Sequence, residues 1–189
     1  PKYRGAAPIN WAIINGETQT GISIITLAEK MDAGQVLAQS QVDIGPDETA
    51  GQLHDKLAGS AAPLLINTLD GIAAGTAVYI DQDDSKATLA PKLKKSDGCL
   101  NFAESAQTIA RKIRGFWPWP GASATYISTQ TGKSERVIIA MAQEIQTQNT
   151  AGLAPGTLDE NLEVICGANS LKITKITPAG SPLMSFRAF

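Results

Sequence analysis

The sequence contains little cysteine or histidine, and this limits the metal chemistry open to it. Of its 189 residues, two are cysteines and one is a histidine. Cys99 and Cys166 are far apart and lack the spacing of metal ligands, and His54 cannot complete a histidine-based site with them. We therefore expect no metal cofactor, and we predict that both thiols are buried in a protein of a reducing compartment.

Long apolar runs and an excess of basic residues are also absent. No stretch of about 18 apolar residues occurs, and no charged start followed by an apolar segment indicates export. The net charge is −2, so any nucleic acid must be bound by a local patch of cations rather than by the charge of the whole chain. We expect a cytoplasmic monomer that does not contact a membrane.

Several catalytic motifs are missing as well. The sequence has no Gly-x-Ser-x-Gly, so serine-histidine nucleophile chemistry is unsupported, and it lacks the glycine-rich motifs of phosphate loops and dinucleotide sites. What it does have is a hydrophobic content of 43%, which is enough for one large or two small domains with cores of their own.

The most informative segment is 21–37, which predicts two strands joined by a short loop. β-Branched residues indicate the first strand, and a second extended run begins at about Gln35. Between them Asp32-Ala33-Gly34 is a turn sequence in which the glycine is free to take a positive φ. From composition alone, Asp32 could simply cap the turn of a hairpin; its chemical role depends on the wider pattern.

The segment before this hairpin predicts a loop that leads into a helix. Pro8 suits a first helical turn, and Asn15-Gly16 is a stop signal. Tyr3 and Arg4 beside Gly5 place an aromatic ring and a cation next to flexible backbone, an arrangement suited to an anionic ligand or an RNA phosphate. A solvated loop is the alternative interpretation.

Taken together, these segments resemble the folate-dependent formyltransferases. The string PKYRGAAP, the following NGET, and the spacing of Gly21, Ser23, Asp32 and Gly34 are similar to the methionyl-tRNA formyltransferase family, although Thr26-Leu27 is a mild departure. The resemblance implies an α/β Rossmann-like formyltransferase domain, of which this chain holds the C-terminal part, with Asp32 as the catalytic aspartate. It also implies a binding site for 10-formyltetrahydrofolate bordered by Pro1, Tyr3, Arg4 and Gly5.

In that family an asparagine and a histidine complete the catalytic group, and the resemblance implies that both precede Pro1. We therefore expect this chain to belong to a longer polypeptide, and we expect the 189 residues alone to be inactive.

Helical spacing of leucines predicts an amphipathic helix from about Thr49 to Ala74, in which Pro63 either introduces a kink or begins a second helix. An acidic cluster and then a basic one follow, and this change of sign predicts a linker over residues 86–98. We assign residues 1–85 to the catalytic domain and residues 99–189 to a second domain.

The second domain is predicted to begin with one helix capped by Ser105 and to continue as short strands, a pattern typical of a small closed or partly open barrel. The strands are expected at 122–128, 136–142, 157–158, 162–166 and 170–176. Between Lys92 and Ala122 the sequence again resembles methionyl-tRNA formyltransferases, which implies an OB-like domain that binds tRNA. The cations expected to contact tRNA are Lys92, Lys94, Lys95, Arg111 and Arg114.

The resemblance implies transfer of a formyl group from 10-formyltetrahydrofolate to the amino group of methionyl-initiator tRNA, at the start of protein synthesis. Two alternatives remain open. One is an N-formyltransferase for a nucleotide-linked amino sugar, since those enzymes also carry a Pro-Trp-Pro element. The other is a non-catalytic RNA-binding OB module attached to an inactive remnant.

Overall fold

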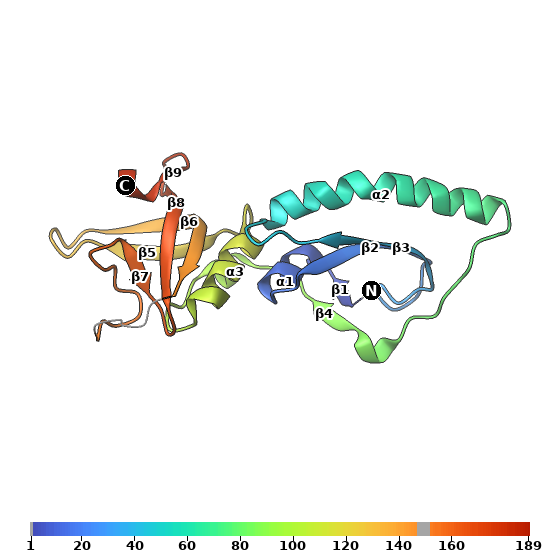
Figure 1. Cartoon of the computed structure of the whole chain (residues 1–189), viewed down its shortest axis with the longest axis horizontal. Coiled ribbons are helices and arrows are strands. Elements are labelled where there is room, and N and C mark those ends of the chain that lie inside the picture. Colours follow the sequence, from blue (N-terminus) through green and yellow to red (C-terminus); the bar gives the residue numbers. More distant parts are fainter. Residues whose placement is uncertain (1, 147–151) are drawn as a thin grey trace. The chain divides into compact units, whose positions relative to one another are not determined.

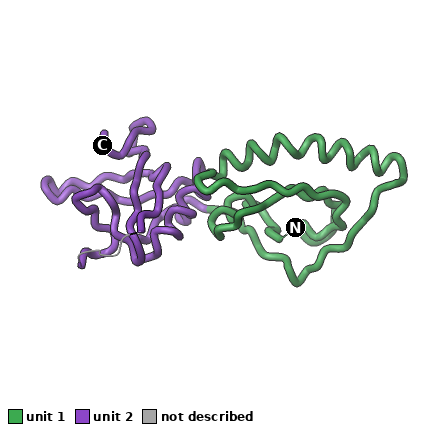
Figure 2. The backbone as a smooth tube through the Cα atoms, in the orientation of Figure 1, with its two compact units in different colours: residues 1–93 green, residues 94–189 purple. Residues whose placement is uncertain are grey.

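The computed structural model describes residues 2–146 and 152–189. The chain divides into two compact units, residues 1–93 and residues 94–189 (Figure 2). The division falls inside the segment 86–98 at which the charge pattern changes sign. Each unit has its own helices and sheets, labelled in Figure 1.

Unit 1 is built on a hairpin and two helices. The hairpin consists of β2 (Gln19–Ile25) and β3 (Val36–Asp43), which pair antiparallel, and it confirms the strands predicted on either side of Asp32. Helix α1 (Pro8–Ile14) begins at Pro8 and is capped at Asn15, as predicted. Helix α2 (Ala50–Ala73) runs alongside the hairpin (Figure 1).

A second, parallel pairing in unit 1 was not predicted. The short strand β1 (Tyr3–Gly5) pairs with β4 (Thr88–Ala90), so residues far apart in the sequence become neighbours. Ala90 and Leu93 are buried, and the Trp11 indole N–H donates to the Pro91 carbonyl at 2.9 Å. The first part of the 86–98 segment is therefore packed into unit 1.

Helix α2 begins as its sequence predicts. The Thr49 side chain accepts from the Gln52 N–H, and the Gln52 side chain accepts from the Thr49 N–H, which satisfies two donors at the helix start. Pro63 lies within this single helix and does not begin a second one. The first turns bury Leu53 and Leu57 against α1, whereas the second half leaves apolar side chains exposed: Leu65, Ile66, Leu69 and Ile72.

Unit 2 packs one helix on an antiparallel sheet. Helix α3 (Ala106–Phe116) has Ser105 as its N-cap, as predicted, and buries Ile109, Ile113 and Phe116. The sheet has the strand order β5-β6-β8-β7, and β9 also pairs with β8. The strands are β5 (Ala122–Ile127), β6 (Ser134–Ile145), β7 (Glu163–Ile165), β8 (Ser170–Pro178) and β9 (Met184–Ser185).

These strands confirm four of the five that the sequence predicted for the second domain. The fifth, at Thr157-Leu158, contributes only an isolated bridge from Leu158 to Val164. Within the described residues β6 is the one strand of the sheet that pairs with β5, so the sheet is open, and its closure into an OB-like barrel stays a prediction.

The cysteines differ in part from expectation. Neither forms a disulfide; Cys166 is buried, and burial raises the pKa of its thiol to about 11. Cys99 is exposed, so the prediction that both thiols are buried was wrong. The error arises because Cys99 lies just after a short 3₁₀ turn, Lys95–Gly98, and joins β5 only through a bridge to Ser123.

No helix in the described part of the chain combines the length and apolar content that a membrane crossing needs. In that same part, no three His, Cys, Asp or Glu side chains come together in a group that could hold a metal ion.

Candidate active site

Asp32 lies in the loop between β2 and β3 and is half-buried. One of its carboxylate oxygens, Oδ2, accepts a hydrogen bond from the backbone N–H of Gly5 at 2.8 Å. The two residues are 27 positions apart, and the hydrogen bond joins the loop to strand β1. The structure therefore places the predicted catalytic aspartate against one of the predicted folate-binding residues.

The backbone of this loop differs from the prediction that glycine takes the positive φ. Asp32 itself has φ 55°, a left-handed conformation that aspartate adopts more readily than most residues with a Cβ. Gly34 is required for a different reason: a Cβ on it would lie 1.8 Å from the Thr26 carbonyl oxygen. The loop is closed at its base by two hydrogen bonds between Thr26 and Gln35, each 2.9 Å long.

Gly5 also occupies a position that only glycine fits. Its φ is 135°, and a Cβ would lie 2.4 Å from the carbonyl oxygen of Ala90 on β4. The backbone of β1 therefore lies close to β4, and the N–H of Gly5 is left to meet Asp32. The parallel pairing and the hydrogen bond to Asp32 together fix the position of Gly5.

Arg4 is engaged within its own chain. Its side chain is only 12% exposed, and its Nη2 donates to Gln82 Oε1 at 2.8 Å and forms an ion pair with Asp84 Oδ1, also at 2.8 Å. Its charge is thus already paired with a carboxylate, which weakens the expectation that Arg4 binds an anionic ligand directly. Binding of folate by Arg4 stays a prediction.

Tyr3 belongs to a separate polar cluster. Its hydroxyl donates to Glu17 Oε1 at 2.7 Å and accepts from the Asn15 amide at 3.2 Å, and the Lys2 ammonium pairs with the same Glu17 oxygen. Burial, with a smaller contribution from Glu17, raises the pKa of Tyr3, and the hydrogen bonds from Lys2 and Tyr3 lower the pKa of Glu17. The carboxylate of Glu17 therefore stays ionised and Tyr3 stays a neutral donor near neutral pH.

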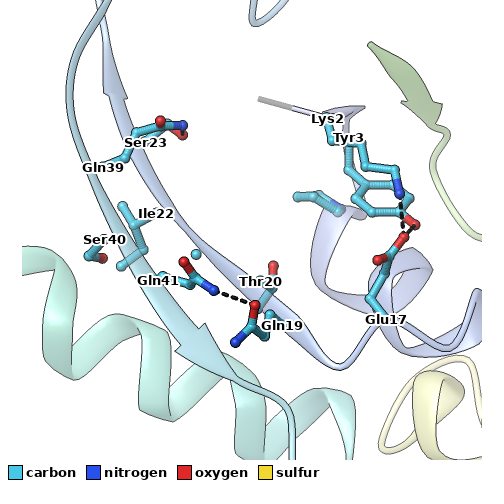
Figure 3. Close-up of a pocket in the computed structure, with 12 residues that line it drawn as sticks. Lys2, Tyr3, Glu17, Gln19, Thr20, Ile22, Ser23, Gln39, Ser40 and Gln41 are labelled. Carbon is cyan, nitrogen blue, oxygen red and sulfur yellow. Dashed lines mark hydrogen bonds and ion pairs between the residues drawn. The ribbon is translucent and has the colours of Figure 1, made fainter. Parts of the chain in front are cut away.

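This cluster forms one side of a cavity of about 410 Å³. Figure 3 shows Lys2, Tyr3 and Glu17 on that side, and the lining side chains of β2 and β3 across from them. Neither Asp32 nor Gly5 is among the lining residues that the described part of the chain provides. The predicted folate-binding residues are therefore divided: Tyr3 lines the cavity, Gly5 contacts Asp32, Arg4 is paired internally, and Pro1 lies outside the described residues.

The predicted tRNA-binding cations fall in both units. Lys92, Lys94 and Lys95 are exposed, and no ion pair within the described residues involves them. Arg111 and Arg114 lie three positions apart on α3 and therefore share a face, opposite the buried face of that helix. The neighbouring Lys112 is paired with Glu104 at 2.6 Å.

Sequence reasoning missed Gln82, which contacts the Asp32 loop from a distance of 50 positions. No local pattern marks it, because it lies in an irregular acidic segment just before β4. Sequence reasoning also missed that Glu17 accepts from the Tyr3 hydroxyl and pairs with the Lys2 ammonium, because Glu17 was considered only as part of the NGET sequence that resembles the family.

The fold and these sequence features are those of a formyl transferase, and the chain belongs to that family. Residues 92–189, more than half of the chain, match the family described as "Formyl transferase, C-terminal domain", and residues 1–69 match "Formyl transferase".

The similar curated proteins carry a more particular name, methionyl-tRNA formyltransferase. The protein of that name from Geobacter metallireducens is 38% identical over 100% of this chain and 59% of its own length. The one from Trichlorobacter lovleyi is 40% identical over 100% of this chain and 58% of its own length. The one from Solibacter usitatus is 49% identical over 67% of this chain and 40% of its own length. The chain thus spans at most about 60% of these relatives.

Solved structures share the fold at low identity. HypX from Aquifex aeolicus in complex with tetrahydrofolic acid gives a TM-score of 0.68 at 18% identity, covering 98% of this chain and 32% of HypX. An N-formyltransferase from Helicobacter canadensis, in complex with folinic acid and dTDP-3-aminofucose, gives 0.69 at 16% identity, covering 92% of this chain and 62% of that one.

Proposed function

We propose that a polypeptide containing this chain transfers a formyl group from 10-formyltetrahydrofolate to the amino group of methionyl-initiator tRNA. The observation that carries the proposal is the match of the whole chain, at 38–40% identity, to relatives named methionyl-tRNA formyltransferase. The sugar N-formyltransferase has the same fold, but at 16% identity it supports the fold alone. The protein acts as a cytoplasmic monomer in this proposal, and its two unpaired cysteines are in keeping with a reducing compartment.

The reaction forms a bond between the amine nitrogen and the formyl carbon and breaks the bond from that carbon to N10 of the folate. One proton passes from the amine to the folate nitrogen. An amide and an imidazole, which the family resemblance assigns to residues before Pro1, hold the developing oxyanion. Asp32 keeps the imidazole charged, accepts the amine proton and passes it on toward the folate nitrogen. The hydrogen bond from the Gly5 N–H supports this role of Asp32, because it holds the carboxylate oxygen Oδ2 in place.

Folate binding is assigned to the surface around β1, with Pro1, Tyr3, Arg4 and Gly5. Two observations support this assignment: Gly5 contacts Asp32, and Tyr3 lines the 410 Å³ cavity. Two proteins with this fold, HypX and the Helicobacter canadensis N-formyltransferase, were solved in complex with tetrahydrofolic acid and folinic acid, which is in keeping with a folate site here.

Binding of tRNA is assigned to Lys92, Lys94, Lys95, Arg111 and Arg114, and to an OB-like domain over residues 99–189. Two observations support this assignment: Lys92, Lys94 and Lys95 are exposed and form no ion pair within the described residues, and Arg111 and Arg114 add two further cations on α3. Cations near a phosphate backbone bind it by releasing its counterions.

The choice of acceptor is tested with the full-length protein that contains this chain. Radiolabelled 10-formyltetrahydrofolate is offered with methionyl-initiator tRNA or with a dTDP-linked amino sugar. We expect the label to pass to the tRNA and not to the sugar. Transfer to the sugar alone would favour the sugar enzyme, and transfer to neither acceptor would favour a non-catalytic RNA-binding protein.

A further inference from the structure

The side chain of Gln82 connects the Asp32 loop to strand β1. Its Nε2 donates to the Asp32 carbonyl at 2.9 Å and to the Gly34 carbonyl at 2.6 Å, so one amide holds the backbone on both sides of Ala33. Its Oε1 accepts from Arg4 Nη2 at 2.8 Å. Both amide hydrogens and the amide oxygen are therefore used, which fixes the orientation of the group.

Hydrogen bonds between Thr26 and Gln35 close the loop at its base, but apolar contacts do little to hold the rest of it. Leu27 and Met31 are 102% and 70% exposed, so apolar packing does little to position the segment. Asp32 is held at a positive φ, a conformation that persists only when surrounding contacts impose it. Near Asp32 those contacts are the Gly5 N–H on its carboxylate and the Gln82 amide on its carbonyl.

The anchor of Gln82 is itself held in place. Arg4 is mostly buried and paired with Asp84, two positions after Gln82, so one guanidinium contacts both ends of the segment 82–84. Arg4 directly precedes Gly5, the donor to Asp32. A closed ring of contacts therefore runs from Asp32 through Gly5 and Arg4 to Gln82 and back to the Asp32 backbone.

We propose that Gln82 is a positioning residue for formyl transfer: it holds the Asp32 loop so that the carboxylate meets the Gly5 N–H and is aimed at the reacting groups. Its effect on the reaction rests on the proposed function, whereas its effect on the loop does not. Arg4 takes part in this ring, with its charge paired with Asp84 and its Nη2 bonded to Gln82.

The test uses Gln82→Glu in the full-length protein that contains this chain. Glutamate has nearly the same size and still accepts from Arg4, but it cannot donate to the two carbonyls of the loop. We expect the Gly5 amide to exchange with solvent about tenfold faster, because its acceptor is no longer held. Asp81→Asn is the matched control, since Asp81 is exposed, accepts a hydrogen bond from the Gln35 side chain at 2.9 Å, and can still accept it as asparagine. Unchanged exchange at Gly5 in Gln82→Glu would overturn the proposal.

The steady-state kinetics of Gln82→Glu provide a second test of the proposal. We expect Gln82→Glu to lower kcat about 10- to 100-fold with KM changed less than threefold, as misplacement of a catalytic group does. In the Asp32→Asn background the same substitution should add almost nothing, because there is no longer a carboxylate to position. Losses that multiply would show that Gln82 acts on the fold in general. If the unsubstituted protein transfers no formyl group, the proposed function fails, and the Gly5 exchange still decides whether Gln82 holds the loop.

Discussion

At the scale of single residues, the substitution Asp32→Asn distinguishes a catalytic role of Asp32 from a structural one. Asp32→Asn keeps the size of the side chain and an oxygen that can accept from the Gly5 N–H, so the loop should keep its conformation. It removes the charge and the ability to accept a proton, and we expect kcat in the full-length protein to fall by about 10²–10⁴-fold. Rates are measured with saturating folate and methionyl-initiator tRNA.

Asp55→Asn provides the control, because the Asp55 side chain is 86% exposed on α2, where it pairs with the neighbouring His54. If Asp32 merely shapes the turn, asparagine is an acceptable substitute there. Turnover by Asp32→Asn close to that of Asp55→Asn would then contradict the catalytic assignment.

Gly34 is a second residue at which the structure predicts a large effect of substitution on stability. A Cβ at this position would lie 1.8 Å from the Thr26 carbonyl oxygen, so Gly34→Ala must push the two sides of the loop apart. We expect a loss of about 2 kcal/mol or more in the free energy of unfolding, measured by urea denaturation. Gly59→Ala is the control, since Gly59 lies within α2 with no atom near its Cβ position, and it should stabilise by about 0.5–1 kcal/mol.

Equal and small effects of the two glycine substitutions would show that the loop yields easily. In that case the close approach of Gly34 to Thr26 does not position Asp32.

At the scale of elements, the proposed tRNA-binding surface consists of Lys92, Lys94 and Lys95 in the 86–98 segment and of Arg111 and Arg114 on α3. Changing Lys92, Lys94 and Lys95 together to alanine should weaken tRNA binding and reduce the slope of log K against log salt by roughly 2 to 3, since up to three fewer counterions are released. Binding is measured at several salt concentrations.

The matched control removes three other exposed lysines of the same total charge: Lys133, Lys172 and Lys175. It should change the salt slope much less. Equal changes in both triple variants would mean that tRNA responds to the overall charge and not to the proposed surface.

At the scale of the whole molecule, the two units should fold independently, because each has its own core. Unit 1 buries Leu53 and Leu57 against α1, and unit 2 buries Ile109 and Ile113 against its sheet. We expect residues 94–189, expressed alone, to protect the amides of β6 and β8 as strongly as in the whole chain. Amide exchange measures this, and unprotected amides in the isolated piece would contradict it.

The sequence by itself determined those features that depend on neighbours in the chain. The start of α1 at Pro8, the Thr49 and Ser105 caps and the β2–β3 strands all follow from residue types at short spacing, because helix ends and turns satisfy their backbone groups locally. The spacing around Asp32 was also sufficient to indicate the family, which the comparisons then established.

Only the tertiary structure decided which residues meet at the candidate site. The pairing of β1 with β4 brings Arg4 next to Gln82 and Gly5 next to Asp32, across separations that no local pattern encodes. The same is true of the positive φ at Asp32, the exposure of Cys99 and the exposed second half of α2. Each depends on whether distant parts of the chain pack against the residue. The conformational propensities of its neighbours in the sequence do not predict the free energy of such contacts.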